Sequence, residues 1–195
     1  MKIQLKIHKI LALIVLVFGC KSKTEQKNVV IDGQQIEITE SEIELSNDYS
    51  LEDLTYEQIK KIQLDIVEAE IFAANYSNKK EGILESENLD LILKKWKSDQ
   101  SSDKKSEEKV IEIIGSAFGQ NIVENLDSEW QIITDEYGTD FTVIHKEYFV
   151  NGFPYSSVYK AITGEREKSL DGIELIIKSK IQEAMNDGGI DRRKK

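Results

Sequence analysis

Residues 106–146 decide the fold of this chain, and they read SEEKVIEIIGSAFGQNIVENLDSEWQIITDEYGTDFTVIHK. In the first half, apolar residues recur every three or four positions, which is typical of one face of a helix beginning near Ser106. From Trp130 onward, apolar and polar residues alternate, as they do along a half-buried strand, until Tyr137-Gly138-Thr139-Asp140 interrupts the alternation with turn residues. The stretch therefore predicts a helix followed by an antiparallel hairpin.

Helical spacing also occurs on both sides of this stretch. Upstream, it predicts helices over Tyr56–Asn75 and 88–97, with a loop rich in Ser, Asp and Lys over 98–106. Downstream, Ser169 is placed to cap a last helix that Gly188-Gly189 would end. The apolar face of the amphipathic first helix consists of Ile59, Ile62, Ile66 and Ala73, widened by Leu64, Val67 and Ile71.

Two segments leave more than one interpretation open. Asn151-Gly152 and Pro154 signal a turn, and residues 155–162 fit either a short third strand or a helical turn. Residues 29–38 could form a small hairpin around an Asp-Gly pair. The polar composition of residues 21–50 instead favours a solvated tether.

The first twenty residues differ in composition from everything that follows. Three lysines, Lys2, Lys6 and Lys9, precede an unbroken apolar run over 10–18, which is the pattern of a secretory signal peptide. The run is too short to span a bilayer. Cys20, the single Cys of the chain, follows almost directly.

Leu16-Val17-Phe18-Gly19-Cys20 resembles the lipobox of bacterial lipoproteins. The resemblance implies a diacylglycerol on the Cys20 thiol, cleavage after residue 19 and acylation of the new amine, for example with palmitate. More than one acyl chain gives stable membrane anchoring. Because no Asp follows Cys20 and residues 21–24 are not acidic, we expect the protein at the outer membrane, facing the periplasm.

These segments give the expected organisation of the chain. A lipoprotein signal peptide covers residues 1–19, and the anchor Cys with a polar tether covers residues 20–50. A single α+β domain follows over 51–189, with N-terminal helices, a small antiparallel sheet and a C-terminal helix. A basic tail over 190–195 ends the chain.

Composition narrows the range of functions. The 195 residues include 36 acidic and 26 basic side chains, for a formal net charge of -10. An acidic chain lacks the basic face that phosphate binding requires, so no nucleic-acid partner is expected. One Cys excludes an internal disulfide framework. After signal removal, His145 is the only His, so neither a metal site nor a cofactor is expected.

The predicted sheet carries the candidate functional residues. Four carboxylates surround one turn, with His145 downstream, and could supply a general acid/base pair or calcium ligands: Glu129, Asp135, Glu136 and Asp140. A structural role, in which Asp140 binds turn amides, is favoured because the spacing of a calcium loop is absent. Aromatic residues are dense here, and some could form an exposed recognition patch. The candidate binding surface consists of Trp130, Glu136, Tyr137, Asp140, His145, Phe153, Tyr155 and Lys160.

Three patches within residues 106–184 carry a family resemblance. They are Gly115-Ser116-Ala117-Phe118-Gly119-Gln120 followed by Trp130, then Asp135-Glu136-Tyr137-Gly138-Thr139-Asp140, and finally Phe153-Pro154 leading to Lys160 and Gly164-Glu165. In order and spacing they resemble an uncharacterised bacterial family, domain of unknown function 3806. The resemblance implies a fold but no established activity.

Three hypotheses of function follow. The leading one is a lipid-anchored, non-catalytic envelope protein that binds another envelope protein or a peptide through its sheet and aromatic turns. The alternative is an acidic immunity or inhibitor protein that neutralises a basic toxin or hydrolase. The third is a hydrolase that uses the turn carboxylates. Whether the protein is an enzyme stays open at this point, with a non-catalytic role favoured.

Overall fold

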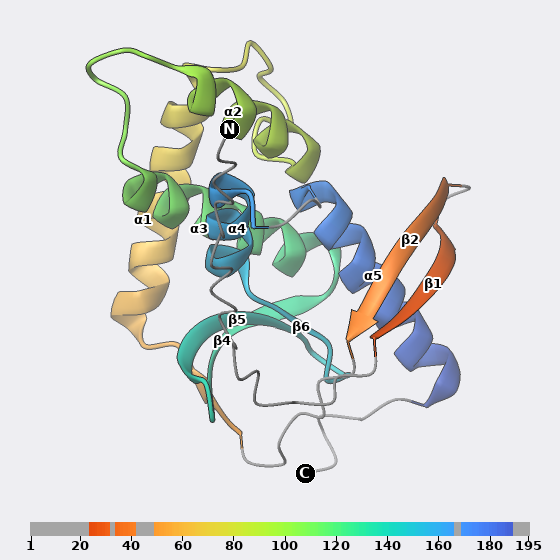
Figure 1. Cartoon of the computed structure of the whole chain (residues 1–195). Helices are drawn as coiled ribbons and strands as arrows, with labels where there is room; N and C mark the ends of the chain where they lie inside the picture. Colours follow the sequence, from red (N-terminus) through yellow and green to blue (C-terminus); the bar gives the residue numbers. More distant parts are fainter. Residues whose placement is uncertain (1–23, 32–33, 42–48, 166–168, 189–195) are drawn as a thin grey trace, which may run out of the picture.

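The computed structural model describes residues 24–31, 34–41, 49–165 and 169–188 (Figure 1). Within them, the helices are α1 (Tyr56–Ala74), α2 (Ser86–Ser98), α3 (Glu107–Asn125), α4 (Pro154–Thr163) and α5 (Leu170–Asp187). The strands are β1 (Thr24–Ile31), β2 (Gln34–Ser41), β3 (Ser50–Asp53), β4 (Ser128–Asp135), β5 (Gly138–His145) and β6 (Asn151–Gly152). The predicted α+β class is confirmed, because helices and an antiparallel sheet occupy separate parts of the chain.

Four strands form one antiparallel sheet in the order β3-β4-β5-β6. β4 and β5 form the predicted hairpin, with Ser128 opposite His145 at one end and Asp135 opposite Gly138 at the turn. The sequence does not predict the two outer strands, β3 and β6. They span only 4 and 2 residues, which is too short for an alternation of apolar and polar residues to be recognised.

The ambiguous segment 155–162 belongs to a helix, α4, and not to a third strand. α4 begins at Pro154, in the first turn, where the fixed φ of proline suits a helix and its missing N–H costs nothing. Gly164 ends the helix with φ of 79°, a left-handed conformation that glycine adopts without strain.

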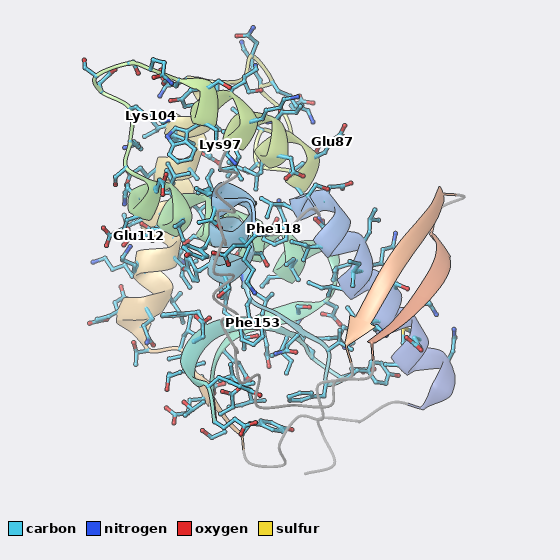
Figure 2. All side chains as sticks on the ribbon, viewed as in Figure 1. Glu87, Lys97, Lys104, Glu112, Phe118 and Phe153 are labelled. Atoms are coloured by element: carbon cyan, nitrogen blue, oxygen red, sulfur yellow. The ribbon has the colours of Figure 1, made fainter. Side chains whose placement is uncertain are left out.

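α3 is the central element of the core. It packs against α1, α2, α4 and the β4–β5 hairpin. Figure 2 shows the side chain of Phe118 among the helices and that of Phe153 near the junction of helices and sheet. The fully buried apolar side chains of α3 are Val110, Ile113, Ile114, Ala117, Phe118 and Ile122.

Two glycines allow other elements to approach α3 closely. A Cβ at Gly115 would lie 2.4 Å from Cδ1 of Tyr155, and a Cβ at Gly119 would lie 2.1 Å from Cζ2 of Trp130. Each glycine costs about 1 kcal/mol of helix stability relative to alanine. In return, the two glycines let the hairpin and α4 pack closely on α3.

The predicted cap of α5 is present, and α3 begins with a similar one. The hydroxyl of Ser106 accepts a hydrogen bond from the N–H of Lys109, at 3.3 Å, at the start of α3. Ser169 accepts one from the N–H of Gly172, at 3.1 Å, at the start of α5. Gly188 ends α5 in the left-handed conformation, with φ of 68°. These local signals therefore mark the helix ends correctly.

Within residues 21–50, the structure shows the hairpin alternative, and not an irregular tether, for residues 24–31 and 34–41. There, β1 and β2 pair as an antiparallel hairpin from Thr24 opposite Ser41 to Ile31 opposite Gln34. Strand pairing satisfies backbone N–H and C=O groups whatever the polarity of the side chains, so polar composition alone does not exclude a hairpin. The predicted signal peptide, Cys20 and the basic tail lie outside the described residues. No helix of the described part is both long enough and apolar enough to cross a membrane.

Candidate binding surface

α1 is apolar on two faces, and only one of them is buried. The buried side chains, which face α3, are Ile62, Asp65, Ala69, Phe72 and Ala73. In Figure 1, α1 lies at the left edge of the molecule and meets α3 on one side. The exposed apolar side chains include Tyr56, Leu64, Val67 and Ile71, with exposed fractions of 73%, 60%, 55% and 65%.

The exposed side chains form a continuous surface along the helix. A residue in a helix is rotated by about 100° from the one before it, so residues spaced by three or four share a face. The outer face of α1, as it is called below, consists of Tyr56, Lys60, Leu64, Val67, Ile71 and Ala74, all of them exposed.

The prediction that Leu64, Val67 and Ile71 widen one apolar face with Ile62 is wrong. These three residues point away from α3, while Asp65 points toward it. Hydrophobic spacing shows which positions are apolar, but not which side of a doubly apolar helix meets the core. The burial of the Asp65 carboxylate is not predicted from the sequence, and it depends on an ion pair between α1 and α3.

Ion pairs fix the rotation of α1 on α3. Oδ2 of Asp65 lies 2.7 Å from Nζ of Lys61, and Oδ1 lies 3.4 Å from Nζ of Lys109 on α3. The two carboxylate oxygens of Glu68 each lie 2.8 Å from a lysine Nζ, Oε1 from that of Lys105 and Oε2 from that of Lys109. Hydrogen bonds from Lys105 and Lys109 hold the pKa of Glu68 below its usual value, and the bond to Glu68 is the largest cause of a raised pKa at Lys109. A buried carboxylate is tolerated when it is paired in this way.

Two residues of the surface predicted on the sheet, Trp130 and Tyr155, take part in packing within the domain. The rings of Trp130 and Tyr155 have centroids 5.9 Å apart, and those of Phe141 and Tyr155 are 5.7 Å apart. The hydroxyls of Tyr155 and Ser116 are 3.0 Å apart, and burial raises the pKa of Tyr155. Nε1 of Trp130 is buried without a hydrogen-bond partner among the described residues. Trp130 and Tyr155 therefore hold the hairpin and α4 on α3.

The other candidate residues are dispersed over the domain. Oδ2 of Asp140 accepts a hydrogen bond from Ser156 of α4 at 3.2 Å, and Oδ1 accepts the N–H of Phe141 at 2.7 Å. This is the kind of structural role that the sequence favours for Asp140. Glu136 and Tyr137 are exposed in the turn, Phe153 is half-buried before α4, and Lys160 is exposed on α4.

Glu129 is not at the turn but opposite Ile144, next to His145 in the register of the hairpin. His145 is far from the three carboxylates that do lie at or near the turn, Asp135, Glu136 and Asp140. It lies seven residues from the turn along β5, or about 24 Å at the usual strand rise. Asp140 and His145 are five residues apart, so their side chains point to opposite faces of the sheet. Nδ1 of His145 accepts hydrogen bonds from the N–H groups of Glu147 and Tyr148, both at 3.1 Å. These bonds occupy Nδ1 in a structural role.

An acidic group lies where α2 meets α5, and it consists of Glu87, Asp90, Asp171 and Glu174. The carboxylate of Asp90 accepts the N–H groups of Leu170 and Asp171, at 2.9 and 3.1 Å, and so caps α5 from another helix. Burial raises the pKa of Asp90. Burial, with Glu174 and Glu87 nearby, also raises the pKa of Asp171. No cluster of three or more His, Cys, Asp or Glu side chains suited to a metal ion occurs in the described part of the chain.

The fold and this surface define a small α+β protein in which helix α1 has an apolar face that no other described element covers. Residues 88–171 match the model of a family described as Domain of unknown function (DUF3806). The resemblance to this domain is therefore confirmed, and the match runs from α2 to the start of α5. α1 and the N-terminal strands lie outside it. No curated protein and no solved structure matches the chain.

Proposed function

We propose that this protein is a lipid-anchored protein of the bacterial cell envelope whose folded domain is a non-catalytic protein-binding module. The binding surface is the outer face of α1. The observation that carries this proposal is the exposure of Leu64, Val67 and Ile71 by more than half on a helix whose opposite side is buried.

The exposed apolar side chains support binding because they are contiguous. Single exposed apolar residues are ordinary, whereas a contiguous apolar patch marks an interaction site. α1 has 19 residues, so it offers a surface about 28 Å long at 1.5 Å per residue. The ion pairs with α3 hold this surface outward, so binding requires no rearrangement of the domain.

The membrane anchor rests on the sequence of residues 1–20. A lipidated Cys20 would hold the domain at a membrane, and the residues after Cys20 favour the outer membrane with the domain in the periplasm. A Cys20→Ser variant is the direct test. The variant is expected in the soluble fraction, and its persistence in the membrane pellet would contradict lipid anchoring.

Binding through α1 is tested by comparing matched substitutions in the full chain. The wild type, Val67→Lys and Leu91→Lys are each used to capture proteins from detergent-solubilised envelope. Val67 and Leu91 are similarly exposed, at 55% and 53%, but Leu91 lies on α2. A partner retained by the wild type and Leu91→Lys but lost from Val67→Lys supports the proposal. Equal capture by all three, or capture by none, would contradict it.

A second function, an acidic inhibitor or immunity protein, is favoured by the acidic group between α2 and α5. Asp90 and Asp171 are half-buried there, burial raises the pKa of both carboxyls, and Glu87 and Glu174 lie near Asp171. A basic partner would relieve the repulsion among these carboxylates. This function predicts capture of a basic protein that is lost between low and physiological salt, whereas binding through the outer face of α1 is expected to survive the change.

A further inference from the structure

We propose that the outer face of α1 binds the same face of a second copy of this chain, with the two helices antiparallel. The inference names the partner of the surface on which the proposed function rests. Two observations support this dimer: the spacing of the exposed residues, and two charged side chains that form no ion pair within the described residues.

The spacing of the outer face is that of a short coiled-coil seam. Its residues from Lys60 to Ala74 follow one another at intervals of four, three, four and three positions: Lys60, Leu64, Val67, Ile71 and Ala74. Alternating intervals of three and four keep a stripe facing one partner helix. The apolar centre of the seam, Leu64 with Val67, can therefore interlock with the same pair on a second helix.

Two charged side chains, Lys60 in the outer face and Glu70 at its edge, are available for a partner. Lys60 and Glu70 are exposed, and neither forms an ion pair with any residue in the described part of the chain. They are ten residues apart on one helix, or about 15 Å, so they cannot pair with each other. The other exposed α1 lysine, Lys61, is already paired with Asp65 and Glu112.

An antiparallel arrangement brings these charges together. If a two-fold axis passes between Leu64 and Val67, then Lys60 of one copy lies beside Ile71 of the second copy. Its ammonium group then reaches Glu70 of the second copy, and symmetry repeats the contact. A parallel arrangement would instead place Lys60 against Lys60, which is repulsive. Charge complementarity therefore selects a second copy in the antiparallel orientation.

The seam is short, so the association is expected to be weak on its own, with a Kd of about 1–100 µM. Copies held on one membrane by the proposed lipid anchor would meet at a higher effective concentration. The contact is isologous and closes after two copies, because each copy has a single outer face on α1.

Sedimentation equilibrium of the full chain in a neutral detergent measures this association. The wild type and Leu91→Lys are expected to form a dimer, and Val67→Lys a monomer. Lys60→Glu and Glu70→Lys each place two like-charge contacts in the dimer and are expected to weaken it about tenfold. The double variant Lys60→Glu/Glu70→Lys reverses both charges and is expected to restore wild-type affinity. Far-ultraviolet circular dichroism confirms that each variant keeps its helices.

The following results would contradict self-association through α1. A monomeric wild type would overturn it, as would a dimer unaffected by Val67→Lys, since that dimer would use another surface. A double variant no tighter than the single ones would exclude the antiparallel orientation. If the wild type is monomeric but Val67→Lys loses a different captured envelope protein, self-association fails while the proposed function stands. If it is monomeric and captures nothing, both fail.

Discussion

Replacing Gly119 with alanine tests how closely the hairpin packs on α3. The added Cβ would lie 2.1 Å from Cζ2 and 2.2 Å from Cη2 of Trp130, and 2.9 Å from Cγ of Pro154. An ordinary carbon–carbon contact is about 3.5–4.0 Å. The indole would have to move by more than 1 Å, away from its packing against Tyr155.

Two opposing effects set the magnitude. Overpacking of a well-filled core costs about 1–3 kcal/mol, and the crowded site of Gly119 places this change at the upper end. Exchanging glycine for alanine within a helix returns about 1 kcal/mol. The net loss in the free energy of unfolding is therefore about 2 kcal/mol. For a domain of this size that corresponds to a Tm lower by about 4–8 °C.

Urea unfolding followed by circular dichroism measures this loss. Gly172→Ala on α5 is the matched control, because its Cβ would meet only Oγ of Ser169, at 3.2 Å, and we expect a change within about 1 kcal/mol. Gly119→Ala should also cost less in a Trp130→Phe background, where the two contacting ring atoms are removed. A Gly119→Ala protein as stable as the wild type would refute this account of the packing.

Three further predictions concern polar contacts. The hydroxyl of Tyr76 donates a hydrogen bond to Asp99 at 2.6 Å, and burial together with this bond raises the pKa of Tyr76 to about 12. The stability that the protonated hydroxyl contributes is complete below pH 10 and is lost as pH rises through 12. An ultraviolet titration in which Asp99→Ala leaves the midpoint of Tyr76 unchanged would contradict this. Asp65→Ala is expected to lower the free energy of unfolding by about 1–3 kcal/mol, because the carboxylate is buried. Lys61→Ala is expected to lower it by less than about 1 kcal/mol, because the Lys61 side chain is half exposed. Equal losses in urea unfolding would argue against a buried carboxylate that orients α1. Asp90→Ala removes the acceptor of two N–H groups at the start of α5 and should speed their hydrogen exchange. Because burial raises the pKa of Asp90, protonation of this carboxyl favours the folded state at acid pH, and that advantage is lost as pH rises through the raised pKa. The variant should lack this pH dependence.

Much of the fold can be predicted from local patterns. The helix from Ser106 and the turn between two alternating strands depend on residues close together in the chain. Capping hydroxyls and left-handed glycines act over three or four residues, so their signals survive in any tertiary context. The α+β class follows from the order of these elements.

The candidate site could be predicted only in part. Trp130 and Tyr155 do come together, but as packing between the hairpin, α4 and α3. Asp140 and His145 lie on opposite faces of the sheet, which the alternation of the strand already implies. The intervals of three and four between the apolar residues on the outer face of α1 are visible in the sequence. The same helix has a second apolar side, however, so the intervals do not show which side is exposed.

The sequence by itself determined where α1, α2, α3, α5 and the β4–β5 hairpin lie in the chain, because caps, turns and hydrophobic period are local. Only the tertiary structure decided which face of α1 meets the core. That choice depends on Asp65, which is buried because Lys109 reaches it from α3, 44 residues later in the chain. An ion pair over such a separation leaves no periodic trace in the sequence, and so the exposed apolar face of α1 becomes visible only once the helices are packed.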